Sequence, residues 1–559
     1  MNAISSAASV SAPRPRRWIG GWRLGVVLVA LITALPVITV FSFIFEPAAG
    51  VWQHLAATGL QDYIVNSILL MIGVGVGTLL LGVSTAWVSA TCEFPGRRWF
   101  EWALLLPMAI PAYIVAYTYT GLLDFSGPVQ SLLRESFGWG YGDYWFPNIR
   151  SLAGAVVMLS LVLYPYVYLL ARAAFLEQSV CVLEVSRTLG ASPMHTFLRV
   201  ALPMARPAII AGLLLVLMET LADYGTVQYF GVSTFTTGIF RTWFGLGDPA
   251  AAAQLSALLM GFVFVLILLE HRSRRAARYH DSGARVRSLP RHQLAGWRMA
   301  VGLAVCIVPL LFGFLLPAGQ LLAWSVRTAG KMLDADFLRI VTNSLALAGS
   351  AALVTLVMGL FMAYGKRLHG NVWVSGAVRT AGMGYAIPGT VIAIGVMIPF
   401  AWLDNHIDAW MRAQFDFSTG LLLSGTLVAL LFAYMVRFLA VALQTIEAGL
   451  ARIRPGMDDA ARSLGFGPMH VLRKVHVPML RGSLLTAMLL VFVDVLKELP
   501  ATLVLRPFNF NTLAVRTYEL ATDERLADAA SASLAIVLVG IIPVILLSRS
   551  LSQTRRRYE

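Results

Sequence analysis

Long apolar runs alternate with short charged segments along the whole chain. Most runs contain roughly 18 to 25 residues, the length that an α-helix needs to cross the hydrocarbon core of a bilayer. Charged residues gather between the runs rather than within them. The pattern predicts an all-α protein with about twelve membrane-spanning helices, near residues 24–45, 64–90, 101–122, 151–172, 205–222, 252–270, 299–325, 343–365, 377–403, 418–445, 481–497 and 529–548.

The composition supports a membrane protein. Hydrophobic residues make up 58% of the 559-residue chain and charged residues only 13%, with a mean hydropathy of +0.73. One soluble core could not hide so much apolar surface. The first run is longer than the apolar part of a signal peptide, so we expect it to remain as the first helix.

Arginine and lysine mark one side of the membrane. Because basic residues favour cytoplasmic loops, we expect both termini and the basic linker at 271–298 to be cytoplasmic. The net charge of +14 is then explained by topology and by attraction to an anionic lipid bilayer, and no nucleic acid partner is expected. The marking residues include Arg14, Arg16, Arg17, Arg23, Arg97, Arg98, Arg187, Arg199, Arg206, eight arginines from Arg272 to Arg298, and Arg555, Arg556 and Arg557.

The chain repeats itself at a nearly constant offset. Because each copy holds an even number of spans, the two copies should run in the same direction. We expect a first repeat at 1–270, the linker at 271–298 and a second repeat at 299–559. The recurring motifs are Asn66-Ser67 and Ile110-Pro111, found 277 residues later as Asn343-Ser344 and Ile387-Pro388, and Arg187-Thr188-Leu189-Gly190, found 275 residues later as Arg462-Ser463-Leu464-Gly465.

The motif with the 275-residue offset belongs to a longer loop on the predicted cytoplasmic side, at 180–206 in the first repeat and 450–481 in the second. Small residues let a partner approach a helix closely, and Gly190 and Gly465 permit a sharp reversal of the backbone. Glu184 and Asp459 would be favoured near the start of a helix by its dipole. The alternative interpretation is an ordinary interfacial pair of amphipathic helices.

Both loops resemble the "EAA" loop in the permease subunits of bacterial binding-protein-dependent ABC importers. The resemblance implies the type I importer (MetI-like) permease fold, two copies of an ABC ATPase subunit docked on the loops, and a periplasmic substrate-binding protein. The first copy departs from the family pattern with Val185 and Ser186 in place of alanines. The residues implied to couple with the ATPase are Glu184, Arg187, Gly190, Pro203, Asp459, Ala460, Ala461, Arg462, Gly465 and Pro478.

No nucleotide-binding loop of the form G-x-x-x-x-G-K-[ST] occurs in the sequence. We therefore expect a transport subunit that is not an enzyme and binds no cofactor, with ATP hydrolysed by the partner subunit. Cys92, Cys181 and Cys306 imply no disulfide framework.

Four carboxylates lie at the ends of apolar spans. Glu219 and Asp223 are four residues apart, and Asp494 and Glu498 repeat them 275 residues later. Carboxylates at such depth usually face a water-filled path, so the four are expected to line one cavity, where a hard cation would find oxygen ligands. The alternative is structural pairing, and the basic residues considered for it are Lys497, Arg241 and Arg516. No metal site is firmly assigned.

The stretches 219–241, 497–507 and 511–516 resemble the fused permeases of bacterial ferric iron importers. The resemblance covers nearly the whole chain and implies ferric iron as the cargo, carried across the bacterial inner membrane by alternating access. Fused thiamine permeases share the two-copy layout and stay an alternative. Two alternatives come from other functional classes: a proton-driven secondary transporter that uses the same carboxylates, and a membrane-embedded enzyme.

Overall fold

The computed structural model describes residues 16–140, 142–177, 192–276 and 291–556, and these are almost entirely helical. The first repeat forms α1 (Arg16–Ser42), η1 (Phe43–Phe45), α2 (Ala49–Thr58), α3 (Leu60–Thr91), α4 (Arg97–Ala103), η2 (Leu106–Ala109), α5 (Ala112–Leu123), α6 (Pro128–Phe137), α7 (Leu152–Glu177), α9 (Pro193–Thr196), η3 (Phe197–Ala201), α10 (Leu202–Ala222), α11 (Gly225–Tyr229), α12 (Phe235–Phe240), η4 (Arg241–Gly245) and α13 (Pro249–Ala276).

The second repeat follows the same order. It forms α14 (Trp297–Leu310), η5 (Leu311–Leu315), α15 (Leu316–Met332), α16 (Ala335–Leu368), α17 (Val372–Ala381), η6 (Gly384–Ala386), α18 (Gly389–Phe415), α19 (Leu427–Ala451), α20 (Gly456–Ser463), α21 (Pro468–Val471), η7 (Leu472–His476), α22 (Val477–Met479), α23 (Arg481–Leu496), α24 (Pro500–Leu505), α25 (Leu513–Thr522) and α26 (Leu526–Arg556). Two short parallel strands, β1 (Cys92–Glu93) and β2 (His292–Gln293), join the end of α3 to the segment before α14.

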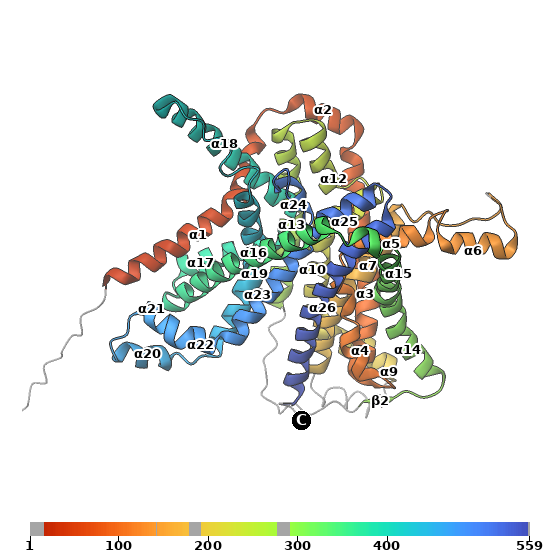
Figure 1. Cartoon of the computed structure of the whole chain (residues 1–559). Coiled ribbons are helices and arrows are strands. Elements are labelled where there is room, and N and C mark those ends of the chain that lie inside the picture. Colours follow the sequence, from red (N-terminus) through yellow and green to blue (C-terminus); the bar gives the residue numbers. More distant parts are fainter. Residues whose placement is uncertain (1–15, 141, 178–191, 277–290, 557–559) are drawn as a thin grey trace, which may run out of the picture.

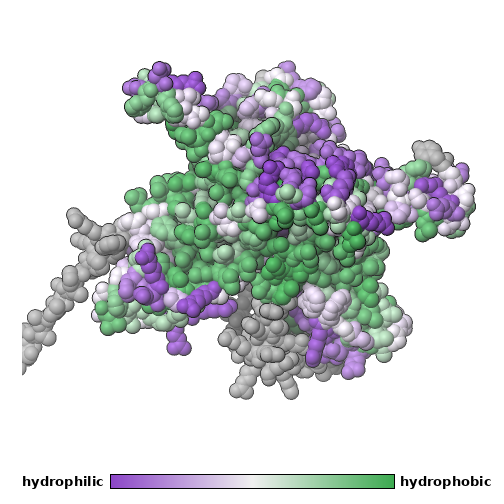
Figure 2. Space-filling view, viewed as in Figure 1, coloured by the Kyte–Doolittle hydropathy of each residue, from purple (hydrophilic) through white to green (hydrophobic). Residues whose placement is uncertain are grey.

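Ten helical segments of the described chain are long and apolar enough to cross a bilayer, and two bent pairs bring the total to as many as twelve. Each of the twelve predicted runs falls on one of these, which confirms the all-α, polytopic fold class. We call the end of the bundle with α20 to α22 the loop face, and the end with α2 and α12 the cap face (Figure 1). Figure 2 shows apolar residues across the middle of the molecule, with hydrophilic residues gathered toward these two ends.

The third predicted span is not straight. The helices on either side of Ile110-Pro111 meet at 89°, and the equivalent Ile387-Pro388 separates η6 from α18. Proline supplies no backbone N–H and disfavours helical geometry in the residue before it, so both repeats break at the same place. A second bend, of 79°, follows α22 in the second repeat, whereas α10 of the first repeat continues unbroken to Ala222.

The two repeats exchange helices instead of folding side by side. Helix α1 packs against α17 and α18 of the second repeat, and α14, η5 and α15 pack against α3, α7 and α5 of the first. The apolar clusters follow the exchange, because one cluster contains both Val26 of α1 and Val391 of α18, and another contains both Leu106 of η2 and Leu310 of α14. Close van der Waals packing of these shared surfaces joins the halves into one body.

The serine of each repeated Asn-Ser pair holds a short helix near the end of its own repeat. Ser67 accepts a hydrogen bond from the backbone N–H of Phe235 at 3.4 Å, and Ser344 accepts one from Leu513 at 2.8 Å. Both serines are buried. Each therefore fastens the start of the cap-face helix, α12 or α25, to the long helix of its own repeat.

Candidate functional site

The four predicted carboxylates line one cavity of about 110 Å³ between the two repeats. The cavity lies where α10 and α23 end, where α5 begins after its proline break, and beside η6, which precedes the second proline break. Other polar lining residues are Tyr113, Tyr166, Tyr224, Tyr385, Arg437 and Lys497. Since a single water needs about 10–15 Å³ of this kind of space, the cavity has room for a small ion with several waters.

Asp223 and Glu498 occupy equivalent structural positions. Asp223 accepts hydrogen bonds from the hydroxyl of Thr226 at 3.0 Å and the backbone N–H of Val227 at 3.1 Å. Glu498 accepts them from the backbone N–H groups of Ala501 and Thr502, both at 3.1 Å. Each carboxylate therefore satisfies free N–H groups at the start of a short helix, α11 or α24. These bonds fix the turn between that short helix and the membrane-spanning helix before it.

Glu498 is also fixed by an arginine that the sequence analysis did not single out. The Nη1 atom of Arg437, on α19, lies 3.1 Å from Oε1 of Glu498, and both side chains are buried. A side chain at Gly389 would collide with both groups, so the glycine after the second proline break gives this pair its space. Arg437 is the one charged residue in the apolar run 418–445, and a lone charge within a span is the signal that could have identified it.

The inner pair of carboxylates differs between the repeats. Oδ1 of Asp494 lies 2.8 Å from Nζ of Lys497. Its counterpart Glu219 has no ion pair within the described part of the chain, and the position equivalent to Lys497 is Ala222. Of the three basic residues considered, the structure thus pairs Lys497 with a cavity carboxylate, while Arg241 and Arg516 are not among the lining residues.

Four carboxylates and two basic groups give the cavity lining a net charge of −2 when all are ionised. Such an excess attracts a cation and repels an anion. Within the described residues no group of three or more His, Cys, Asp and Glu side chains is arranged to hold a metal ion.

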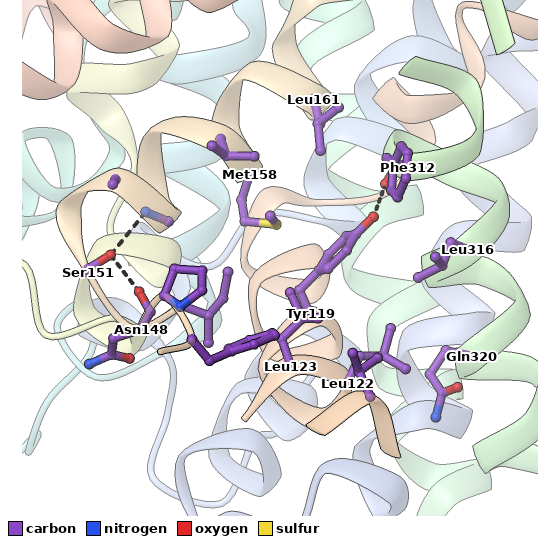
Figure 3. Close-up of a pocket in the computed structure, with 17 residues that line it drawn as sticks. Tyr119, Leu122, Leu123, Asn148, Ser151, Met158, Leu161, Phe312, Leu316 and Gln320 are labelled. Carbon is purple, nitrogen blue, oxygen red and sulfur yellow. Dashed lines mark hydrogen bonds between the residues drawn. The ribbon is translucent and has the colours of Figure 1, made fainter. Parts of the chain in front are cut away.

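A larger cavity of about 700 Å³ has a different character. It lies between α5, α7 and the η5–α15 segment, and its lining includes no Asp, Glu, Lys, Arg or His (Figure 3). The hydroxyl of Tyr119, at its edge, donates a hydrogen bond to the carbonyl oxygen of Phe312 at 2.6 Å. An ion would lose its hydration here without replacement, so this apolar cavity is not the candidate path.

The second repeated loop is described in full. Helix α20 ends in a Schellman motif. The backbone N–H of Gly465 donates to the carbonyl oxygen of Arg462 at 2.9 Å, and that of Phe466 donates to the carbonyl oxygen of Ala461 at 3.1 Å. Gly465 has φ +84°, a conformation in which a side chain is strained. Pro478 lies in the first turn of α22, and its counterpart Pro203 lies in the first turn of α10.

The surface of this loop is mixed in character. Asp459 is 74% and Arg462 55% exposed along their side chains, and the two are 3.8 Å apart. Ala460 is exposed, whereas Ala461 is buried against the body of the protein. The exposed apolar side chains beside them are Met457, Leu464, Phe466, Met469 and Met479. Glu184, Arg187 and Gly190 of the first loop lie outside the described residues.

Asp458, the neighbour of Asp459, ties α20 to the body. Its carboxylate lies 2.7 Å from Nη2 of Arg367 and 2.5 Å from Nε2 of His476. Burial alone would raise the pKa of Asp458, but the hydrogen bonds and charges of Arg367 and His476 outweigh it and hold that pKa below its ordinary value.

Comparison with known proteins agrees with this architecture. The family model for binding-protein-dependent transport system inner membrane components matches residues 78–278 and again residues 355–557. The Fe(3+)-transport system permease protein FbpB 2 of Haemophilus influenzae is 26% identical over 96% of this chain and 99% of its own length. The ferric transport system permease protein FbpB of Actinobacillus pleuropneumoniae is 23% identical over 85% of this chain and 70% of its own length.

A shorter relative matches one repeat only. The molybdenum transport system permease protein ModB of Escherichia coli is 24% identical over 36% of this chain and 87% of its own length. The double match, the ferric relative aligned over its full length and the ten to twelve candidate spans confirm the resemblance and a transport subunit rather than an enzyme. The chain belongs to the family of binding-protein-dependent transport system inner membrane components, as a fused, two-copy permease.

Proposed function

We propose that this chain is the permease of an ATP-driven importer that moves ferric iron from a periplasmic binding protein to the cytoplasm by alternating access. The observation that carries the cargo assignment is the cavity between the repeats, with four carboxylates, two basic groups and a net charge of −2. The relatives named for ferric transport, which align along nearly the whole chain, support the same cargo.

The direction of transport follows from a proposed orientation. The loop face carries α20 and the basic residues around it. The arginines of the linker begin at the C-terminal end of α13, on the same face. Because basic loops favour the cytoplasm, we assign the loop face to the cytoplasm and the cap face to the periplasm. Both termini are then cytoplasmic, and a binding protein would meet the cap face.

The loop at 450–481 supports the proposed ATPase contact. It presents a helix end with exposed small, charged and apolar side chains, including Ala460, Asp459 and Leu464. The polar contacts of Asp458 fix this surface to α16, so a displacement of the loop would be transmitted to a membrane-spanning helix. One ATPase subunit under each repeated loop gives the proposed two-copy partner, and ATP would be bound by that partner alone.

The charge of the cavity suits a cargo that must be released. A trivalent ion facing four unpaired carboxylates would be held too firmly for transport. Arg437 and Lys497 cancel half of that charge, so a ferric ion would leave the lining with a total of only about +1. Carboxylate oxygens are the ligand type that hard cations prefer.

Two other cargoes fit the lining less well. An oxyanion such as molybdate would meet a net negative wall. Thiamine is a cation, but its two rings need more room than the cavity of about 110 Å³ offers in this conformation. The secondary-transporter alternative would use the same carboxylates, but it gives the loop that recurs in both repeats no role.

Uptake by cells tests the cargo assignment. The bacterium that encodes the chain is compared with a strain lacking it, and with that strain complemented, for uptake of radioactive ferric iron, thiamine and molybdate. We expect the deletion to lower ferric iron uptake alone and the complement to restore it. Unchanged iron uptake in iron-limited cells, with loss of one of the other cargoes, would overturn the proposal.

A further inference from the structure

The wall of the cavity contributed by the first repeat is the one whose carboxylate is not neutralised. Glu219 lines the same cavity as Tyr166, Tyr385 and Lys497, and it has no ion pair within the described part of the chain. Asp494, its counterpart, is paired with Lys497 at 2.8 Å. A cation entering the cavity would therefore find its freest carboxylate on α10.

A tyrosine in the same cavity points to a ligand independently of the carboxylates. Tyr113, in the first turn of α5, is only 7% exposed, and its hydroxyl has no hydrogen-bond partner within the described chain. Leaving a buried hydroxyl unpaired costs about 1–3 kcal/mol, so such groups usually serve a function. Tyr113 lines the cavity beside Asp223 and Glu498, about one helical turn from the layer of Glu219.

We propose that Glu219 and the hydroxyls of Tyr113, Tyr166 and Tyr385 form a transit site for a hard metal cation, and that Lys497 is a tethered counter-ion that competes with this cation. The inference rests on the proposed function in that the cargo must be a cation. The inference adds the groups that bind the cation and identifies Lys497 as the residue that sets the residence time of the cation in the cavity.

The chemistry of the site is that of hard oxygen ligands. Carboxylate and hydroxyl oxygens suit small, highly charged ions, and the lining contains eight such groups but no Cys or His and only one thioether, that of Met108. A ferric ion in neutral water carries hydroxide. When a tyrosine replaces that hydroxide, an iron–oxygen bond to the phenolate forms, the iron–hydroxide bond breaks, and the hydroxide takes up the phenol proton and leaves as water. Charge and atoms then balance without a further reactant.

Lys497 acts in the opposite direction. Its ammonium group lies against Asp494 in the cavity that Glu219 also lines, so it already supplies part of the positive charge that the cargo would supply. An entering cation must displace this interaction, and the returning ammonium helps to expel the cation. The equivalent residue in the first repeat is Ala222, so only one such counter-ion is built into this layer.

Binding measurements on the permease–ATPase complex test the site. Ferric ion is supplied as its citrate chelate, and bound iron is measured by equilibrium dialysis, with visible absorption reporting tyrosinate-to-iron charge transfer. We expect Glu219→Gln to weaken binding about tenfold, and Lys497→Met to strengthen it about tenfold while slowing release. Tyr166→Phe and Tyr385→Phe should each reduce the absorption band.

Matched variants separate this effect from general damage. Tyr164→Phe removes a buried hydroxyl on the same helix, where it bonds to the carbonyl oxygen of Leu104, and should leave the band unchanged. Lys366→Met breaks a lysine–carboxylate pair of the same 2.8 Å length with Glu447, away from the cavity, and should leave affinity unchanged. A misfolded variant cannot bind more tightly, so the gain expected for Lys497→Met is the decisive sign.

The results distinguish this inference from the proposed function. If the wild-type complex binds ferric ion but Glu219→Gln and Lys497→Met both leave the affinity unchanged, or both weaken it, the transit site is wrong and iron transport stands. If wild-type cells import no iron at all, the proposed function itself fails.

Discussion

Asp458 on α20 and Arg367 at the end of α16 form an ion pair in which Oδ2 and Nη2 are 2.7 Å apart. Arg367 also donates to the carbonyl oxygens of Leu450 at 2.5 Å and Ile453 at 2.9 Å, and His476 completes the group on the other side. This polar lock, defined as Asp458, Arg367 and His476, fixes the second repeated loop to a membrane-spanning helix.

In the first repeat the three sequence positions that correspond to this lock are all apolar, although Leu183 lies outside the described residues. The positions equivalent by the repeat offsets are Leu183, Ala90 and Ala201. Ala90 and Ala201 are fully buried. All three positions lack charge together, which is expected because a charged group left alone in such a place is costly.

Replacing one member of the polar lock should therefore do more harm than replacing all three. Arg367→Ala leaves Asp458 without its main partner and should destabilise the loop by about 3 kcal/mol. The triple variant Asp458→Leu, Arg367→Ala, His476→Ala copies the first repeat and should recover much of that loss. Thermal unfolding and copurification of the ATPase measure both effects. A triple variant less stable than every single variant would contradict the equivalence.

The polar lock should also depend on pH with a defined sign. The pKa of Asp458 is held below its ordinary value in the folded protein, so the pair contributes stability at neutral pH. That contribution is complete above the unfolded pKa of about 4 and is lost as pH falls through the folded pKa. The melting difference between wild type and Asp458→Asn should therefore shrink as the pH falls below about 4. A difference that grows on acidification would show the opposite linkage.

Coupling should fail when Gly465 receives a side chain. At φ +84° a valine costs on the order of 1–3 kcal/mol and disrupts the Schellman end of α20. Gly465→Val should uncouple ATP hydrolysis from uptake while the protein still inserts, and Gly190→Val is expected to act the same way in the first loop with a smaller effect. Gly482→Ala, where no atom lies within 4 Å of the new carbon, is the control. Normal uptake by the double valine variant would refute this role.

The proposed orientation can be read from cysteine labelling. Phe508 lies in the segment between α24 and α25, and its side chain is 96% exposed. Ser463 is exposed at the end of α20. In a chain whose three native cysteines are replaced by serine, an impermeant thiol reagent added to spheroplasts should label Phe508→Cys but not Ser463→Cys. Both should react after permeabilisation. The reverse pattern would invert the orientation and the direction of transport.

The sequence predicted the spans and the repeat because both rest on local signals. Apolar length identifies a span, and a constant offset identifies a duplication whatever the fold. The same offset placed Glu219, Asp223, Asp494 and Glu498 together, and they line one cavity. Whether they carry cargo stays a proposal.

Other features depended on three-dimensional packing. The exchange of α1 and α14 between the repeats leaves no trace in apolar periodicity, since either half offers a helix an equally apolar surface. Asp458 and Asp459 are neighbours of the same type, and only the rotation of α20 decides that Asp458 faces Arg367. The partner of Glu498 lies 61 residues earlier, on α19, beyond the reach of any spacing rule.

The most direct test of the whole account is accumulation of ferric iron by proteoliposomes that contain the permease, its ATPase and enclosed ATP, with iron-loaded binding protein outside. We predict accumulation that needs both ATP and the binding protein, continues when proton gradients are dissipated, and falls in Glu219→Gln but not in the matched Glu447→Gln. Accumulation driven by an imposed proton gradient without ATP would contradict an ABC importer and indicate a secondary transporter.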